Sequence, residues 1–224
     1  MAIALQKSAA DFLPAHLTLK ALRESARSCK GCDLYKNATQ TVFGEGPQKA
    51  DVIFVGEQPG DQEDRQGRPF VGPVGPAGRL LDKALAAARI SREQIYVTNA
   101  VKHFKWIWRG KRRLHQKPVA RQVMACKPWL EAEFEVLKPK IVVCMGTTAA
   151  QAVLGKTVLI TRERGKFTES DSGLVTFITI HPSAIYRQRD RSEQEKEYDR
   201  FAEEMKLVSR KLRSLTRDTR PMSL

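Results

Sequence analysis

The feature that most constrains this chain is a set of four short apolar runs, each followed by a glycine or a polar residue. The runs are rich in valine and isoleucine and lie at residues 50–56, 94–100, 140–145 and 174–180. Such runs are typical of buried strands. Helical spacing occurs between them, at residues 78–89, at 119–137 and from 147 onward. This alternation predicts an α/β fold, in which a central parallel sheet is flanked by helices on both faces.

The length of the chain, 224 residues, suits a single domain of this kind, and no linker is evident. We expect a helical lead-in over residues 1–28 and the three-layer domain over residues 29–187. A charged helix and tail over residues 188–224 should belong to the same domain. Two segments rich in polar residues, glycine or proline, 57–76 and 102–118, predict long loops. Nothing in the sequence demands a dimer, so we expect a monomer.

The formal net charge of the chain is +14, which is unusual for a folded domain. A domain this basic usually meets a polyanion, either nucleic acid or an anionic membrane. No apolar run reaches the length of a membrane span, so no membrane crossing is expected. The N-terminus lacks the basic start and apolar core of a secretory signal. These features predict a nucleic-acid partner and a cytoplasmic location, in the bacterial cytosol or nucleoid.

Polar or flexible residues follow all four predicted strands. Glu57, Asn99, Gly146 and His181 lie at or just beyond the strand ends. In open parallel sheets, ligands bind beyond the carboxyl ends of the strands. The sequence therefore predicts a site at this edge, although polar residues are also common wherever strands end.

Four cysteines form a second constellation. Cys29 and Cys32 make a CxxC pair, whereas Cys126 and Cys144 fall in a predicted helix and a predicted strand. Four thiolates could close a tetrahedral zinc site or hold a [4Fe–4S] cluster. The split second pair favours the cluster. The alternative is an incidental CxxC with two buried cysteines.

Several short motifs occur in a fixed order along the chain. They are the segments 44–46 (GEG), 56–60 (GEQPG), 67–72 (GRPFVG) and 181–184 (HPSA), together with Asn99. Taken together, these motifs resemble the uracil-DNA glycosylase superfamily. The cysteines resemble those of its iron–sulfur branch, and segment 111–116 (KRRLHQ) resembles the insertion loop of the UdgX class. The resemblance extends from about residue 29 to residue 187. It implies a [4Fe–4S] cofactor and a uracil-containing DNA partner, single- or double-stranded.

The resemblance also implies roles for individual residues. Phe70 would stack on a uracil flipped out of the DNA, and Asn99 would read the edge of the base. His181 would stabilise the negative charge that bond cleavage leaves on the ring. Glu57 would lie close to the deoxyribose. Further substrate contacts are implied for Gln58, Gly60, Asp61, Ser183 and Arg187.

His115 has the most specific implied role. In the UdgX class, a loop histidine attacks the C1′ atom of the sugar and stays bonded to the DNA. A neutral imidazole is a competent nucleophile near physiological pH. Glu57 is the carboxylate expected to orient His115 and accept its proton. Arg113 would pin the loop or bind phosphate, and DNA contacts are expected from Lys111 and Arg112.

The charge of the segment around His115 also indicates a nucleic-acid partner. Between residues 100 and 130 there is no acidic residue, whereas nine are basic. Such a stretch repels itself unless phosphates lie nearby. Two alternatives to covalent trapping remain open. One is an ordinary glycosylase that releases uracil and turns over, and the other is a basic nucleic-acid-binding module without activity.

Overall fold

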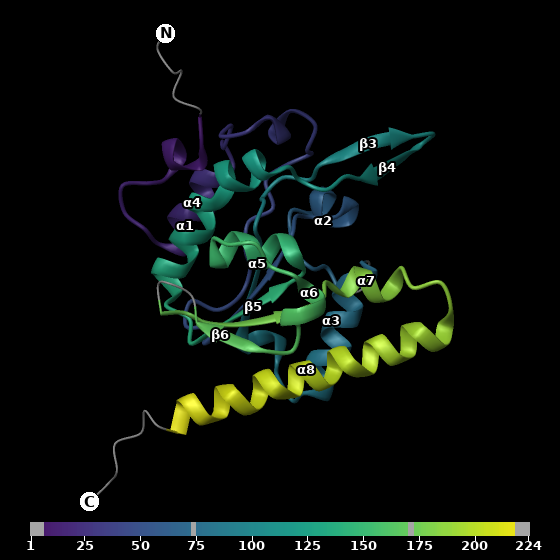
Figure 1. Ribbon diagram of the computed structural model, residues 1–224. Helices are drawn as coiled ribbons and strands as arrows, with labels where there is room; N and C mark the ends of the chain where they lie inside the picture. The colour runs from purple at the N-terminus through teal and green to yellow at the C-terminus, as the bar shows by residue number, and fades with distance from the viewer. Residues whose placement is uncertain (1–6, 73–74, 170–172, 218–224) are drawn as a thin grey trace, which may run out of the picture.

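The computed structural model describes residues 7–72, 75–169 and 173–217 and has three layers (Figure 1). The strands are β1 (Val52–Gly56), β2 (Ile95–Asn99), β3 (Trp106–Arg109), β4 (Arg112–His115), β5 (Ile141–Met145), β6 (Phe167–Glu169) and β7 (Val175–Thr179). The helices are α1 (Leu19–Ala26), α2 (Asp61–Gln66), α3 (Pro76–Ala87), α4 (Ala120–Leu137), α5 (Thr147–Leu154), α6 (Ile160–Glu163), α7 (Pro182–Tyr186) and α8 (Arg191–Arg217). None of the helices that the structure describes is long and apolar enough to cross a membrane.

The central sheet confirms the predicted architecture. Its strand order is β2-β1-β5-β7-β6, and the four predicted strands, β1, β2, β5 and β7, run parallel. The short strand β6, which the sequence analysis did not predict, pairs antiparallel with β7 at one edge. Because the four parallel strands end at the same edge, the residues that follow them are brought together.

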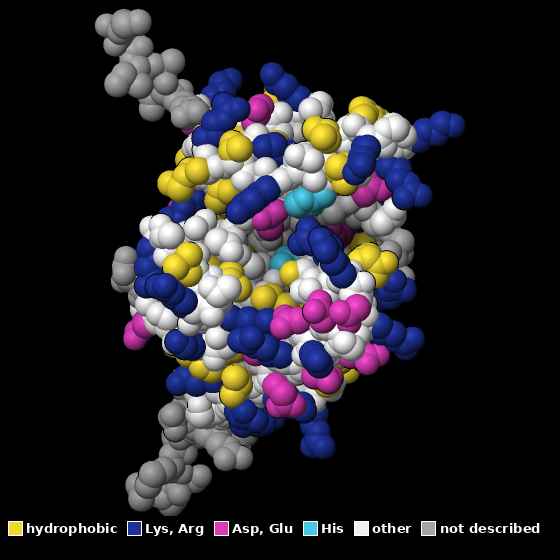
Figure 2. Space-filling view, turned by 45° about the vertical axis from the view of Figure 1, so that its right-hand side comes forward, with side chains coloured by type: hydrophobic (Ala, Val, Ile, Leu, Met, Phe, Trp, Pro, Cys, Tyr) yellow, Lys and Arg dark blue, Asp and Glu magenta, His cyan; other side chains and the backbone are white. Residues whose placement is uncertain are grey.

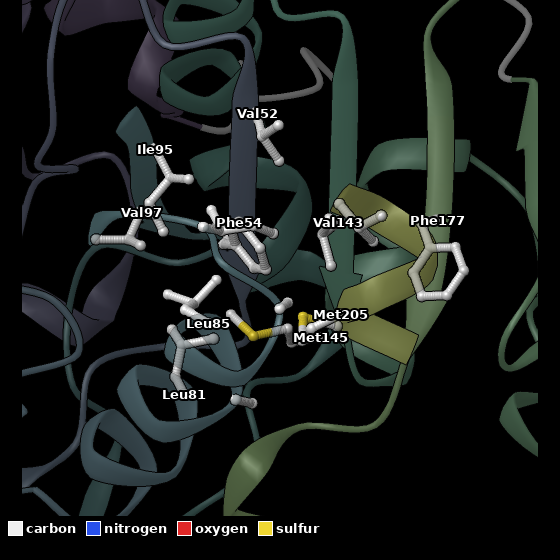
Figure 3. Close-up of a cluster of buried hydrophobic side chains, with 14 of the residues drawn as sticks. Val52, Phe54, Leu81, Leu85, Ile95, Val97, Val143, Met145, Phe177 and Met205 are labelled. Atoms are coloured by element: carbon white, nitrogen blue, oxygen red, sulfur yellow. The ribbon is translucent and has the colours of Figure 1, made fainter. Parts of the chain in front are cut away.

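Each face of the sheet packs against its own helices. Phe54, Val143 and Phe177 point to one face and pack with Leu81 of α3 and Met205 of α8 (Figure 3). Alternate residues of the same strands point to the other face, where α4 and α5 cover them. Burial on both faces explains why the strands are continuously apolar and do not alternate with polar residues.

The prediction of a loop over residues 102–118 is wrong, because a β-hairpin lies there. Strands β3 and β4 pair antiparallel and project from the body of the molecule (Figure 1). The turn between them is Gly110–Lys111, and Gly110 has φ 59°, which matches a two-residue hairpin turn with glycine first. The many charges obscured the alternation of large and polar residues. Helix α2 likewise lies within the loop predicted over residues 57–76.

Helix α8 confirms the predicted C-terminal helix and also contributes to the core. Phe201, Met205 and Val208 are fully buried against the sheet layer. A buried guanidinium, that of Arg164, bonds Glu204 at 2.7 Å and Glu197 at 2.6 Å on the same helix. The helix is therefore part of the domain and not a solvated appendage.

Candidate active site

The ends of the parallel strands surround a cavity of about 360 Å³. Gly56 and Asn99 are register partners at the ends of β1 and β2, as Met145 and Thr179 are in β5 and β7. Figure 2 shows histidine side chains within a hollow whose rim carries basic side chains. The predicted site residues that line the cavity are Glu57, Gln58, Gly60, Asp61, Phe70, His115, His181, Ser183 and Arg187.

Aromatic and polar side chains meet in one corner of the site. The Phe70 ring lies 5.8 Å from the His181 ring, and Phe70 adopts a left-handed backbone with φ 49°, a conformation that is strained for an aromatic residue. A Cβ atom at Gly56 would lie 2.6 Å from Phe70 Cζ and 2.4 Å from Asn99 Oδ1. Glycine is therefore required there so that the Phe70 and Asn99 side chains can lie this close to the end of β1.

Asn99 carries an unused hydrogen-bond acceptor. Its side chain is only 2% exposed, yet Oδ1 accepts no hydrogen bond from any described residue. Buried polar atoms are almost always bonded, and leaving one unpaired costs about 1–3 kcal/mol. An unpaired acceptor beside an open corner calls for a ligand that brings an N–H or O–H donor.

His181 is held in one neutral form. Burial lowers its pKa to about 4, and the positive charge of Arg187 acts in the same direction. The Ser183 backbone N–H donates to Nδ1 at 3.2 Å, so Nδ1 is an acceptor and the proton of the neutral ring is on Nε2. No described residue bonds Nε2, which is therefore free to donate to a ligand. Ser183 in turn receives a hydrogen bond from Arg187 at 3.1 Å.

His115 reaches the cavity from the end of β4. Its Nε2 atom lies 3.5 Å from Glu57 Oε1, and its ring lies 6.0 Å from the Phe104 ring. Desolvation lowers the pKa of His115, although the negative charge of Glu57 partly opposes this shift. The imidazole is therefore neutral near physiological pH and carries a free lone pair. The predicted proximity of Glu57 and His115 is present in the structure.

Arg113 anchors the hairpin and does not line the cavity. Its buried guanidinium bonds Asp61, Asp64 Oδ2 at 2.6 Å and Thr39 Oγ1 at 3.0 Å. Of the two roles predicted for Arg113, pinning the loop matches this geometry, and phosphate binding does not. Asp61 was expected to bind substrate, but its carboxylate is committed to Arg113 and Arg65.

Gln58 holds the two stems of the hairpin together. Its amide group exchanges hydrogen bonds with the backbone of Lys105 and donates to Gln116 O at 2.9 Å. This side chain is therefore bonded to the protein, whereas the residue also lines the cavity, so its substrate contact stays a prediction. Nearby, the Gly60 N–H donates to the buried Glu63 carboxylate, and burial raises the pKa of Glu63.

The two faces of the hairpin differ. Trp106, Trp108, Arg113 and His115 share one face, from which His115 reaches the cavity. On this face the Trp106 Nε1–H donates to Asn37 O at 2.9 Å. The turn itself is exposed and basic, with side chains from Arg109, Lys111 and Arg112. A polyanion lying across the cavity mouth would meet these charges.

The cysteines do not form the predicted set of four. Cys29, Cys32 and Cys126 lie in one cluster, and burial raises the pKa of Cys126 to about 12, with further raising by Cys32 and Cys29. Cys144 lies on β5 in a different cluster, between Val55 and Ile178. Within the described ranges, no three His, Cys, Asp or Glu side chains converge on one metal ion.

Three residues of the site were missed by sequence reasoning. Thr148 bonds Glu57, Glu63 bonds the Gly60 backbone, and Asp64 receives Arg113. Asp64 and Glu63 fall in the segment predicted as a loop, where no helical spacing marked them. Thr148 had one available signal, its place two residues after the glycine that ends β5.

The architecture is a three-layer α/β domain with a cavity at the ends of its parallel strands. The chain belongs to the uracil DNA glycosylase superfamily, whose profile matches residues 43–206. It is 36% identical over 184 residues to the Type-4 uracil-DNA glycosylase of Archaeoglobus fulgidus, spanning 79% of this chain and 87% of the relative. The Thermotoga maritima Type-4 enzyme is 36% identical over 172 residues, spanning 76% and 84%. That of Sulfurisphaera tokodaii is 32% identical over 195 residues, spanning 83% and 84%.

Proposed function

We propose that this protein is a uracil-DNA glycosylase that excises uracil from DNA and stays attached to the sugar through His115. The observation that carries the first part is the buried, unpaired Oδ1 of Asn99. The N3–H of uracil would satisfy this acceptor, whereas N3 of cytosine carries a lone pair and would be repelled. The names of the relatives, Type-4 uracil-DNA glycosylases, agree with this substrate.

Excision requires that the uracil ring accept the electron pair of the C1′–N1 bond. The Nε2–H of neutral His181 is free to donate to a carbonyl oxygen of the base, where negative charge develops. A donor that is already oriented needs no reorganisation during the reaction. Phe70 would stack on the base. These residues supply base recognition and leaving-group stabilisation.

The covalent step rests on His115. As the C1′–N1 bond breaks, a lone pair of the neutral imidazole forms a bond to C1′, and uracil leaves as the anion. The alkylated ring then carries one positive charge, which it loses with its remaining N–H proton. Glu57, 3.5 Å from His115 Nε2, faces this charge and is suited to accept the proton. Because imidazole is a poor leaving group here, the product persists as a protein–DNA crosslink.

The test combines the protein with a uracil-containing oligonucleotide and separates the products on a denaturing gel. We expect a slow, heat-stable band from the wild type. The His115→Ser variant should lose this band and instead release uracil and an abasic site, because water then captures the sugar. An ordinary glycosylase would turn over repeatedly and respond little to His115→Ser. Salt-sensitive DNA binding without uracil release by either protein would support an inactive binding module.

We also propose that Cys29, Cys32 and Cys126 hold a [4Fe–4S] cluster, which places the protein in the iron–sulfur branch. The three thiols share one buried cluster of side chains, and the Trp129 Nε1–H donates to Cys29 Sγ at 3.3 Å. The Lys102 N–H donates to Cys126 Sγ, also at 3.3 Å. Backbone and indole donors of this kind stabilise ligand thiolates. Cys144 lies in the other buried cluster, on the sheet, so we infer that it is not part of this set.

A further inference from the structure

Thr148 contacts the carboxylate that faces His115. It is the second residue of α5, its side chain is 5% exposed, and its hydroxyl donates to Glu57 Oε2 at 2.5 Å. The other oxygen, Glu57 Oε1, lies 3.5 Å from His115 Nε2. The two oxygens of one carboxylate are thus divided between a buried hydroxyl and the imidazole.

This division matters because Glu57 is otherwise loosely held. Its side chain is 23% exposed at the mouth of the cavity, and no other described side chain donates a hydrogen bond to it. A glutamate has rotatable bonds that a single water-exposed contact does not restrain. The exposed Arg187, whose charge lowers the pKa of His115, is a competing partner for a mobile carboxylate at this mouth. The bond from Thr148 ties Glu57 to a helix that the core holds in place.

We propose that Thr148 is a positioning residue that orients Glu57 for the covalent step. This inference rests on the proposed function, because it assigns Glu57 the task of facing His115 as the ring becomes alkylated. The step itself is unchanged: the His115–C1′ bond forms, the C1′–N1 bond breaks, uracil leaves with the electron pair, and the imidazolium proton passes to Glu57. Thr148 keeps its own proton and reacts with nothing.

The test measures the single-turnover rate of crosslinking at saturating protein, together with DNA affinity, for matched variants. Thr148→Val keeps the shape of the side chain and removes the hydroxyl, so crosslinking should slow about tenfold or more, as expected for loss of a hydrogen bond to a charged group. The dissociation constant for DNA should stay unchanged. Thr148→Ser restores the hydroxyl and should restore most of the rate.

Two further variants separate positioning from packing. Thr147→Val changes the neighbouring threonine of the same helix, whose side chain makes no hydrogen bond to a described residue, and should not slow crosslinking. In a Glu57→Gln background, Thr148→Val should add little, because the carboxylate that Thr148 orients is gone. Equal rates for Thr148→Val and Thr148→Ser would overturn the proposal. The proposal would also be overturned if Thr148→Val slowed crosslinking as much in the Glu57→Gln background as in the wild type. A wild type that forms no crosslink and releases no uracil would instead overturn the proposed function.

Discussion

At the scale of single residues, two neutral histidines are assigned opposite tasks. Desolvation lowers the pKa of both His115 and His181. In His181, the Ser183 N–H fixes the proton on Nε2, so the ring is a donor. In His115, the neutral ring has a lone pair beside Glu57 and can act as a nucleophile. The same physical effect therefore supports leaving-group stabilisation in one ring and attack in the other, because their neighbours differ.

The pH dependence of crosslinking should follow His115. Protonated imidazole has no lone pair, so the rate should fall as the pH drops through the pKa of His115. Because desolvation lowers that pKa, the decline should begin at a lower pH than it would for an ordinary histidine. Uracil release by His115→Ser should stay constant to about pH 5, because the pKa of His181 is about 4. Rates measured at fixed ionic strength would contradict this if both proteins declined together.

A single added carbon at Gly56 should displace Asn99 and Phe70. In Gly56→Ala the new Cβ atom would lie 2.4 Å from Asn99 Oδ1, closer than real Cβ contacts allow. We expect uracil release and crosslinking to fall at least about a hundredfold, with DNA binding through the basic rim retained. Gly155→Ala is a control for lost stability, since its Cβ atom would meet nothing within 4 Å but its φ of 68° makes alanine strained there. Equal activity of the two variants would count against the assigned base corner.

At the scale of elements, the stems, the end and the turn of the hairpin have different roles. Its stems are fastened by Gln58 and Arg113, His115 ends strand β4, and the turn presents Lys111 and Arg112 to solvent. A two-stranded ribbon is only marginally stable alone, so these tertiary contacts hold it in place. Fixing the stems while exposing the turn lets the hairpin meet DNA and still place His115 near Glu57.

Replacing the turn charges should weaken DNA binding and its salt dependence. For the double variant Lys111→Gln/Arg112→Gln, the slope of log K against log salt should fall by about two, one for each lost phosphate contact. The crosslinking rate at saturating protein should be unchanged, because neither side chain lines the cavity. Lys196→Gln/Arg210→Gln, on the distant helix α8, removes the same charge as a control. Identical slopes for the two double variants would show that only net charge matters.

At the scale of the whole molecule, the buried hydrophobic residues that the structure describes form three clusters. Two lie on the faces of the sheet, and the third joins the N-terminal segment to α4 around Cys29 and Cys126. The third cluster also borders a buried ion pair, in which Lys102 Nζ lies 2.6 Å from Glu133 and donates to Asn99 O at 2.9 Å. The buried Lys102 thus connects the cysteine region to Asn99 at the end of β2.

Single cysteine replacements should distinguish the two kinds of thiol. Cys126→Ala should abolish the brown colour and the visible absorbance of purified protein, with iron content falling in parallel. Cys144→Ala should keep both, and should lose stability by about 1 kcal/mol because a buried sulfur is removed from the sheet. Loss of the cluster from both variants would return Cys144 to the ligand set.

Some elements of the fold could be predicted from the sequence, and others could not. Continuous apolar runs, such as the one that ends at residue 56, sufficed to predict the parallel sheet. A strand that is buried on both faces is apolar along its whole length, so it can be recognised in the sequence alone. The positions of Glu57, Asn99 and His181 at one edge followed from that topology. The hairpin escaped prediction because its strands are exposed and charged, so periodicity was weak. Cys144 was misassigned because spacing along the chain does not report which face of a sheet a side chain takes.

The fold class, the edge where the site lies and the residue types available for chemistry could all be predicted from the sequence. All three depend on local pattern and strand direction. Only the tertiary structure decided how those residues are used. It committed Gln58, Asp61 and Arg113 to the hairpin, left Asn99 Oδ1 unpaired, and brought Thr148 to Glu57 across 91 residues of sequence. Hydrogen-bond partners depend on packing between distant segments, which no local pattern records.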